Sequence, residues 1–134
     1  MRYLAALEPA KIFFTGRSQV RADEVLADIT HRYPKIQAKF VHMDLASLFD
    51  IQRGVDLLIP QLNGRLDVLI CNAGIMAAPP GLSTDGYEIQ FATNYLGHAL
   101  LTQHLLPTLT ATASSHGDAR IVNTTSEGLM LAPS

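Results

Sequence analysis

The polar side chains of this chain that could do chemistry stand directly after short apolar runs. With small neighbours and one leucine, they form four groups: Arg17 and Ser18; Asp44 and Leu45; Asn72, Ala73 and Gly74; and Thr124, Thr125 and Ser126. An arginine guanidinium can bind a phosphate through two hydrogen bonds, and a carboxylate can accept a hydrogen bond from the amine of a base. Small residues let the backbone approach a ligand closely. The combination is typical of a nucleotide-binding site.

Alternating strands and helices are expected to position these residues. Apolar runs predict strands at residues 11–15, 38–42, 66–71 and 121–123, and helical spacing predicts helices at 2–8, 21–33, 45–62 and 86–106. Asp85 with Glu88 is expected to cap the last helix, Pro107 to kink or end it, and residues 110–117 to form a loop. The run at 66–71 is apolar enough to predict a strand covered on both faces. Such alternation indicates a parallel sheet, in which ligands bind at the carboxyl ends of the strands.

Composition and charge exclude several other classes of protein. The chain has 134 residues, 48% apolar and 16% charged, which is at most one globular domain. A net charge of −2 gives no basis for binding nucleic acid or an anionic membrane. The sequence also contains no run of the ~18 apolar residues that a membrane-spanning helix needs. The five histidines are scattered, so no metal site is expected. The N-terminus lacks a signal-peptide pattern and Cys71 lies in an apolar run, so we expect a buried, reduced thiol and a cytoplasmic protein.

Three features follow one another in a fixed order: Asn72, Ala73 and Gly74 after an apolar run, then Asn94, then Ser126 after a second apolar run. This order resembles the middle of a short-chain dehydrogenase/reductase, and especially the fungal and retinol-dehydrogenase-like members. The resemblance implies an oxidoreductase that transfers a hydride between NADP and a carbonyl or secondary alcohol of a small or secondary metabolite.

The resemblance also implies a role for each site residue. It assigns Arg17 to the adenosine 2′-phosphate of NADP, Asp44 and Leu45 to the adenine, and Asn72, Ala73 and Gly74 to positions along the cofactor. Ser18, next to Arg17, is also expected to bind the cofactor. Asn94 would hold a water that relays protons, and Ser126 would hydrogen-bond the substrate oxygen. From the residues alone, Arg17 could also be a solvated loop arginine and Asp44 a helix N-cap.

Two motifs of that family have no counterpart in these 134 residues. They are the glycine-rich turn that holds the pyrophosphate and the Tyr-x-x-x-Lys that supplies the proton donor; Tyr87 and Tyr95 lie upstream of Ser126 and lack the lysine. We therefore expect an α/β fold in which residues 1–134 form a single incomplete domain. It would be a partial Rossmann-like doubly wound parallel sheet without its first, central strand and its C-terminal strands. Two two-stranded halves are expected, with a closed-up sheet or an unfolded chain as alternatives, and the chain alone is expected to be inactive.

Two other hypotheses stay open at this point. The chain could be a non-catalytic fragment that associates with a full-length paralogue through the helix at 86–106, which many family members use for dimerisation. The same helix could form homo-oligomers. A different α/β nucleotide binder is a third hypothesis, which the spacing of Asn94 and Ser126 disfavours.

Overall fold

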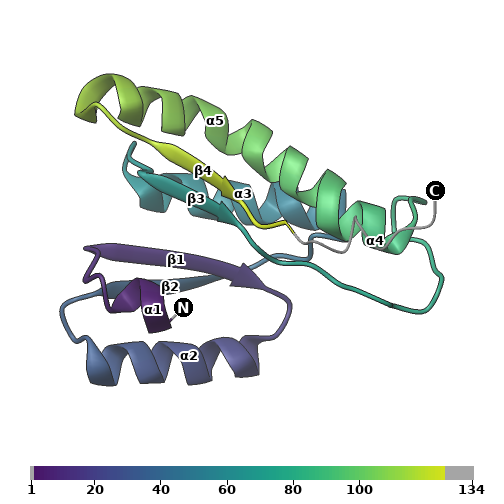
Figure 1. The fold of residues 1–134 in the computed structure, drawn as a ribbon, viewed down its shortest axis with the longest axis horizontal. Helices are drawn as coiled ribbons and strands as arrows, with labels where there is room; N and C mark the ends of the chain where they lie inside the picture. The colour runs from purple at the N-terminus through teal and green to yellow at the C-terminus, as the bar shows by residue number, and fades with distance from the viewer. Residues whose placement is uncertain (1, 126–134) are drawn as a thin grey trace.

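The computed structural model describes residues 2–125 (Figure 1). Its elements in chain order are α1 (Arg2–Ala5), β1 (Lys11–Gly16), α2 (Gln19–Arg32), β2 (Gln37–His42), α3 (Leu48–Leu62), β3 (Val68–Cys71), α4 (Ile89–Phe91), the π-helix η1 (Ala92–Leu96), α5 (Gly97–His116) and β4 (Arg120–Asn123). The alternation of helices and strands is the predicted one. Most boundaries differ from the predicted ones by a few residues, because helix and strand ends depend on local caps.

The strands of residues 2–125 form two parallel two-stranded sheets, β1–β2 and β3–β4. In the first sheet Lys11 pairs with Gln37 and Gly16 with His42; in the second, Val68 pairs with Arg120. Figure 1 shows α2 along the β1–β2 sheet and α5 along the β3–β4 sheet. The prediction of two separate halves is confirmed, and the closed-up sheet that would pair β1 with β3 is wrong for the described residues. A partial Rossmann-like fold accounts for this arrangement.

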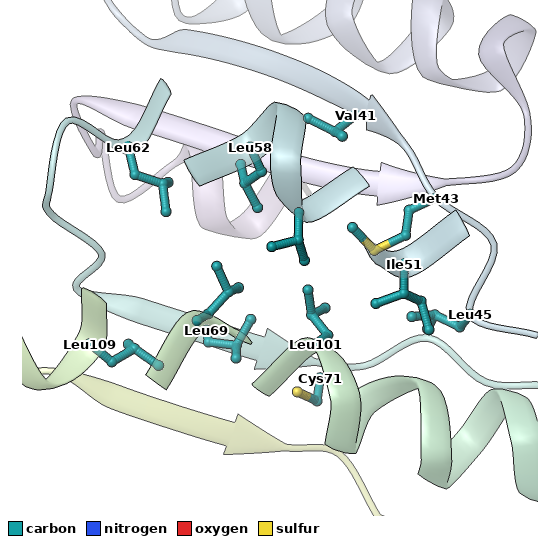
Figure 2. Close-up of a cluster of buried hydrophobic side chains, with 12 residues drawn as sticks. Val41, Met43, Leu45, Ile51, Leu58, Leu62, Leu69, Cys71, Leu101 and Leu109 are labelled. Carbon is teal, nitrogen blue, oxygen red and sulfur yellow. The ribbon is translucent and has the colours of Figure 1, made fainter. Parts of the chain in front are cut away.

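The larger of two apolar cores in residues 2–125 joins the two sheets through α3 and α5. Its buried side chains come from β2 and the segment after it, α3, β3 and α5: Val41, Met43, Leu45, Ile51, Val55, Leu58, Leu62, Leu69, Cys71, Leu101, Leu105 and Leu109 (Figure 2). The α3 and α5 members recur at three and four residues, so each helix presents one apolar face. Cys71 is a buried free thiol, as predicted. No helix among residues 2–125 is long and apolar enough to cross a membrane.

The end of the long helix differs from the prediction. α5 continues through Pro107 to His116 and ends at Gly117, whose φ is +84°, so the loop predicted at 110–117 is wrong. The hydroxyl groups that favoured a loop instead bond the helix itself: Thr112 Oγ1 donates to the carbonyl of Thr108 at 2.9 Å. Thr112 is also buried and accepts a bond from the Leu66 amide at 2.9 Å. The buried hydrogen bond between Thr112 and Leu66 therefore helps to stabilise a helix end that composition disfavours.

The cap before this helix also differs from the prediction. Glu88, not Asp85, is the N-cap of α4, and its carboxylate accepts from the amides of Gln90 at 3.0 Å and Phe91 at 2.7 Å. These backbone hydrogen bonds lower the pKa of Glu88. Asp85 instead accepts from the Leu48 amide at 2.9 Å, at the N-terminus of α3. The carboxylate therefore ties the loop before α4 to another helix.

β3 is covered on only one face by the described residues. Leu69 and Cys71 are buried in the core, whereas Val68 and Ile70 are 47% and 39% exposed. The prediction of a strand covered on both faces is therefore wrong for residues 2–125. Its apolar composition still fits a parallel strand, because side chains alternate between the two faces.

Candidate functional site

The predicted residues at the ends of three strands surround one hollow. It is open to solvent and has a cavity volume of about 100 Å³. It is lined by the end of β1, by residues that follow β1, β2 and β3, and by one residue of η1: Thr15, Gly16, Arg17, Met43, Asp44, Leu45, Ala73, Gly74, Ile75 and Thr93. Five predicted site residues therefore meet there: Arg17, Asp44, Leu45, Ala73 and Gly74. The carboxyl ends of parallel strands are the positions where such folds bind ligands.

The β1 side of the hollow carries an unpaired cation. Arg17 is exposed, and within residues 2–125 its side chain has no hydrogen bond or ion pair. Ser18 is the N-cap of α2: its hydroxyl accepts from the Arg21 amide at 3.3 Å. The Met43 amide donates to the Gly16 carbonyl at 3.0 Å and so extends the β1–β2 pairing to the rim of the hollow. The guanidinium thus stands beside a helix N-terminus, where anions are favoured.

The β2 side is held by a carboxylate that sequence reasoning missed. The Asp44 amide donates to Asp50 Oδ2 at 2.8 Å, and Asp50 also pairs with Arg53 at 2.5 Å and His42 at 3.3 Å. Asp44 Oδ1 accepts from the Ala46 amide at 2.9 Å, and Ser47, not Asp44, is the N-cap of α3. Asp50 therefore fixes the backbone of Asp44, and the second carboxylate oxygen of Asp44 accepts no hydrogen bond within the described chain.

The turns after β3 and β4 are tied to each other. Thr124 Oγ1 donates to Asn72 Oδ1 at 3.0 Å, and the Thr124 amide donates to the Cys71 carbonyl at 3.0 Å. Asn72 thus contacts the hydroxyl cluster predicted beside it. Ser126, the predicted hydroxyl donor to substrate, lies outside the described residues.

Asn94 clamps the backbone of Ile75 with both ends of its amide. Its Oδ1 accepts from the Ile75 amide and its Nδ2 donates to the Ile75 carbonyl, each at 2.8 Å. A Cβ built on Gly74 would lie 3.2 Å from Asn94 Oδ1, so a side chain there would crowd the clamp. Asn94 belongs to the π-helix η1, and such wide turns are common at functional sites. The side chain therefore positions the turn after β3.

Gly97 and His98 continue the same helical surface. A Cβ on Gly97 would lie 2.5 Å from the Leu45 carbonyl oxygen, so glycine permits the close approach of α5 to the turn after β2. His98 Nε2 lies 2.7 Å from the Ala73 carbonyl oxygen. Sequence reasoning treated His98 as an ordinary histidine, although its position one turn after Asn94 places both on one face. No cluster of three or more His, Cys, Asp or Glu able to hold a metal occurs within residues 2–125.

Comparison with known proteins decides the family. The model of the short chain dehydrogenase family matches residues 2–131. The chain belongs to this family. Among its relatives, an uncharacterized oxidoreductase of Schizosaccharomyces pombe is 36% identical over 98% of this chain, and the short-chain dehydrogenase/reductase drtF of Aspergillus calidoustus is 37% identical over 92%. This short-chain dehydrogenase chain spans 40% of the length of each of these two relatives.

Solved structures of similar fold include a complex with a nicotinamide cofactor. The NADPH-bound carbonyl reductase from chicken fatty liver is 26% identical, with a TM-score of 0.73 over 95% of this chain and 53% of that one. The Pseudomonas aeruginosa RhlG/NADP active-site complex is 29% identical, with a TM-score of 0.62 over 81% of this chain and 42% of that one. The short-chain dehydrogenase chain therefore shares its fold with the corresponding part of both structures.

Proposed function

We propose that this chain binds NADP and forms part of an oxidoreductase that transfers a hydride between the nicotinamide and a carbonyl or secondary alcohol of a small metabolite. The proposal rests on one observation: Arg17, Asp44 and Gly74 line the same hollow, although they lie far apart in the sequence. The two structural relatives that hold NADPH or NADP support the choice of cofactor.

The adenosine end of the cofactor fits the β1–β2 side of the hollow. Arg17 has a free guanidinium that can form two hydrogen bonds with the 2′-phosphate, and the α2 N-terminus at Ser18 adds a favourable dipole. Asp44 keeps one carboxylate oxygen for the exocyclic amine of adenine, while Leu45 supplies an apolar contact. A basic residue in place of an acidic one after β1 favours NADP over NAD.

The nicotinamide end would lie beside the turn after β3. When bound there, the cofactor would donate a hydride in its reduced form, NADPH, or accept one in its oxidised form, NADP⁺. Asn72, Ala73 and Gly74 would let the backbone approach the cofactor, and Asn94 would hold that turn and serve the proton relay. Ser126 would hydrogen-bond the substrate oxygen and stabilise the charge that develops on it. The pyrophosphate between the two ends has no glycine-rich turn in these 134 residues, so we assign only the ends of the cofactor.

Fragments of the cofactor test the proposal directly. Calorimetric titration of the chain with 2′,5′-ADP and with 5′-AMP compares ligands with and without the 2′-phosphate. We expect 2′,5′-ADP to bind about 10-fold to 100-fold more tightly, which is the effect of a charge-assisted contact. Arg17→Ala should remove that preference, whereas Lys35→Ala, an exposed cation before β2 at the opposite ends of the strands, should keep it. Equal affinity for both ligands in the unchanged chain would contradict the proposal.

We also propose that the segment 86–106 forms an oligomer contact, with a second copy or with a full-length paralogue. An exposed aromatic pair supports this: Phe91 and Tyr95 stack at 5.2 Å between ring centroids and are 49% and 61% exposed. Aromatic side chains of this kind are enriched at protein interfaces. In size-exclusion chromatography Tyr95→Glu should shift an oligomer to monomer, and Tyr3→Glu on α1 should not. A chain that elutes as a monomer at every concentration, alone and mixed with a full-length relative, would refute this contact.

We further propose that residues 1–134 form one incomplete dinucleotide-binding domain of a cytoplasmic protein. The larger core supports the first part, because it joins residues of both sheets. The free, buried thiol of Cys71 is consistent with a reducing compartment.

A further inference from the structure

The ring of His98 has a defined hydrogen-bonding state. Its Nε2 lies 2.7 Å from the Ala73 carbonyl oxygen, which can only accept, so Nε2 must carry the proton. Its Nδ1 is buried and has no hydrogen-bond partner in the described part of the chain. A ring with its proton on Nε2 therefore matches both environments.

Side-chain packing contributes little to the stability of the turn that His98 contacts. Asn72, Ala73 and Gly74 are exposed, and small side chains contribute little packing. Within residues 2–125 its conformation therefore depends on polar contacts: Thr124 to Asn72, Asn94 to Ile75 and His98 to Ala73.

His98 also belongs to a surface that contacts two turns of the hollow at once. Asn94, Gly97 and His98 lie three and four residues apart, on one face of the helix. Gly97 approaches Leu45 after β2, whereas Asn94 and His98 bond the turn after β3. Because β2 and β3 belong to different sheets, this face sets the position of one turn relative to the other.

We propose that His98 is a positioning residue for the cofactor turn. Its Nε2–H holds the Ala73 carbonyl so that the backbone of Ala73 and Gly74 keeps its place in the hollow. The part concerning the cofactor rests on the proposed function, whereas the part concerning the turn stands on the contacts alone.

Three variants separate this role from general stability. His98→Phe keeps an aromatic ring without the donor, and His98→Gln keeps a donor that reaches the same carbonyl. His104→Phe is the matched control on the same helix. His98→Phe removes the hydrogen bond to Ala73, so the turn should open more often. Hydrogen exchange of the Ile75 amide in the same turn should then be about fivefold to tenfold faster, the effect of losing one hydrogen bond. His98→Gln should restore the rate to within about twofold, and His104→Phe should leave it unchanged.

Two further measurements complete the test. Nitrogen NMR of the unchanged chain should show a protonated Nε2 and an unprotonated Nδ1 in the His98 ring, and NADP titration should show about fivefold to tenfold weaker binding by His98→Phe. A ring protonated at Nδ1 alone, an unchanged Ile75 rate in His98→Phe, or a folded His98→Gln as defective as His98→Phe would each overturn the proposal. If the unchanged chain binds no NADP, the proposed function fails, while the ring state and the Ile75 rate still decide the role of His98 in the turn.

Discussion

Gly97 allows a quantitative test of how closely α5 must approach the turn after β2. A Cβ at this position would lie 2.5 Å from the Leu45 carbonyl oxygen and 2.9 Å from Leu45 Cβ, where ordinary contacts are 3.4–4 Å. The backbone of Gly97 is in the right-handed helical region, so alanine brings no strain of its own. Gly97→Ala therefore probes only the lack of space, and one of the two backbones must move.

Gly54 on α3 provides a matched control. A Cβ there would lie 2.6 Å from Met43 Cε, the mobile end of a side chain, and 3.3 Å from the His42 carbonyl oxygen. Both substitutions gain about 1 kcal/mol from the better helix propensity of alanine. Overpacking costs about 1 to 3 kcal/mol; we assign the upper value to Gly97, where backbone must shift, and the lower value to Gly54.

The two variants should therefore differ by about 2 kcal/mol in free energy of unfolding, with Gly54→Ala close to the unchanged chain. Urea denaturation followed by the helical circular dichroism signal measures this difference, and it corresponds to about 8 °C in Tm for a chain of this size. Gly97→Ala should also bind 2′,5′-ADP more weakly, because Leu45 lines the hollow. If Gly97→Ala is as stable as Gly54→Ala, the close approach of α5 to Leu45 does not restrict this position.

Two other predictions concern single contacts. Asn94→Ala removes both hydrogen bonds to Ile75 and should lower the free energy of unfolding by about 1 to 2 kcal/mol in urea. Gln90→Ala, a partly buried side chain of the same region, is the control, and equal stability of the two variants would contradict the clamp. Glu88 has a pKa below its ordinary 4.5 because the amides of Gln90 and Phe91 donate hydrogen bonds to its carboxylate. The contribution of this carboxylate to the free energy of unfolding is therefore complete above pH 4.5 and is lost as the pH falls through the lowered pKa. The stability advantage of the unchanged chain over Glu88→Gln should therefore shrink on acidification, and an advantage that does not change with pH would refute the carboxylate cap.

Strands and the ligand edge could be predicted from the sequence because both depend on local pattern. The apolar run before Asn72 predicts a strand, and the rule that parallel strands bind ligands at their carboxyl ends then places Arg17, Asp44 and Gly74 together. The separation into two sheets followed from the family strand order, in which the central strand lies between β1 and β3.

The remaining features depend on partners distant in the sequence. Thr112 keeps the last turn of α5 helical because it meets Leu66, 46 residues earlier. Asp85 bonds Leu48 across 37 residues, and His98 bonds Ala73 across 25. Nothing in the local composition around these residues identifies such partners. Asp50 was missed for another reason, because its role depends on the backbone of Asp44 and not on a motif.

The division into two sheets couples the shape of the hollow to the interior of the protein. Within residues 2–125 no backbone hydrogen bond joins β1–β2 to β3–β4, yet the hollow takes Arg17 and Asp44 from one sheet and Gly74 from the other. The span between the two rims therefore depends on core side chains such as Ile51 and Val55 as well as on the face formed by Asn94, Gly97 and His98. Small changes of volume far from the ligand would let the layers slide by shear and alter the width of the mouth. If the hollow binds the cofactor as proposed, substitutions in the core should change ligand affinity as well as stability.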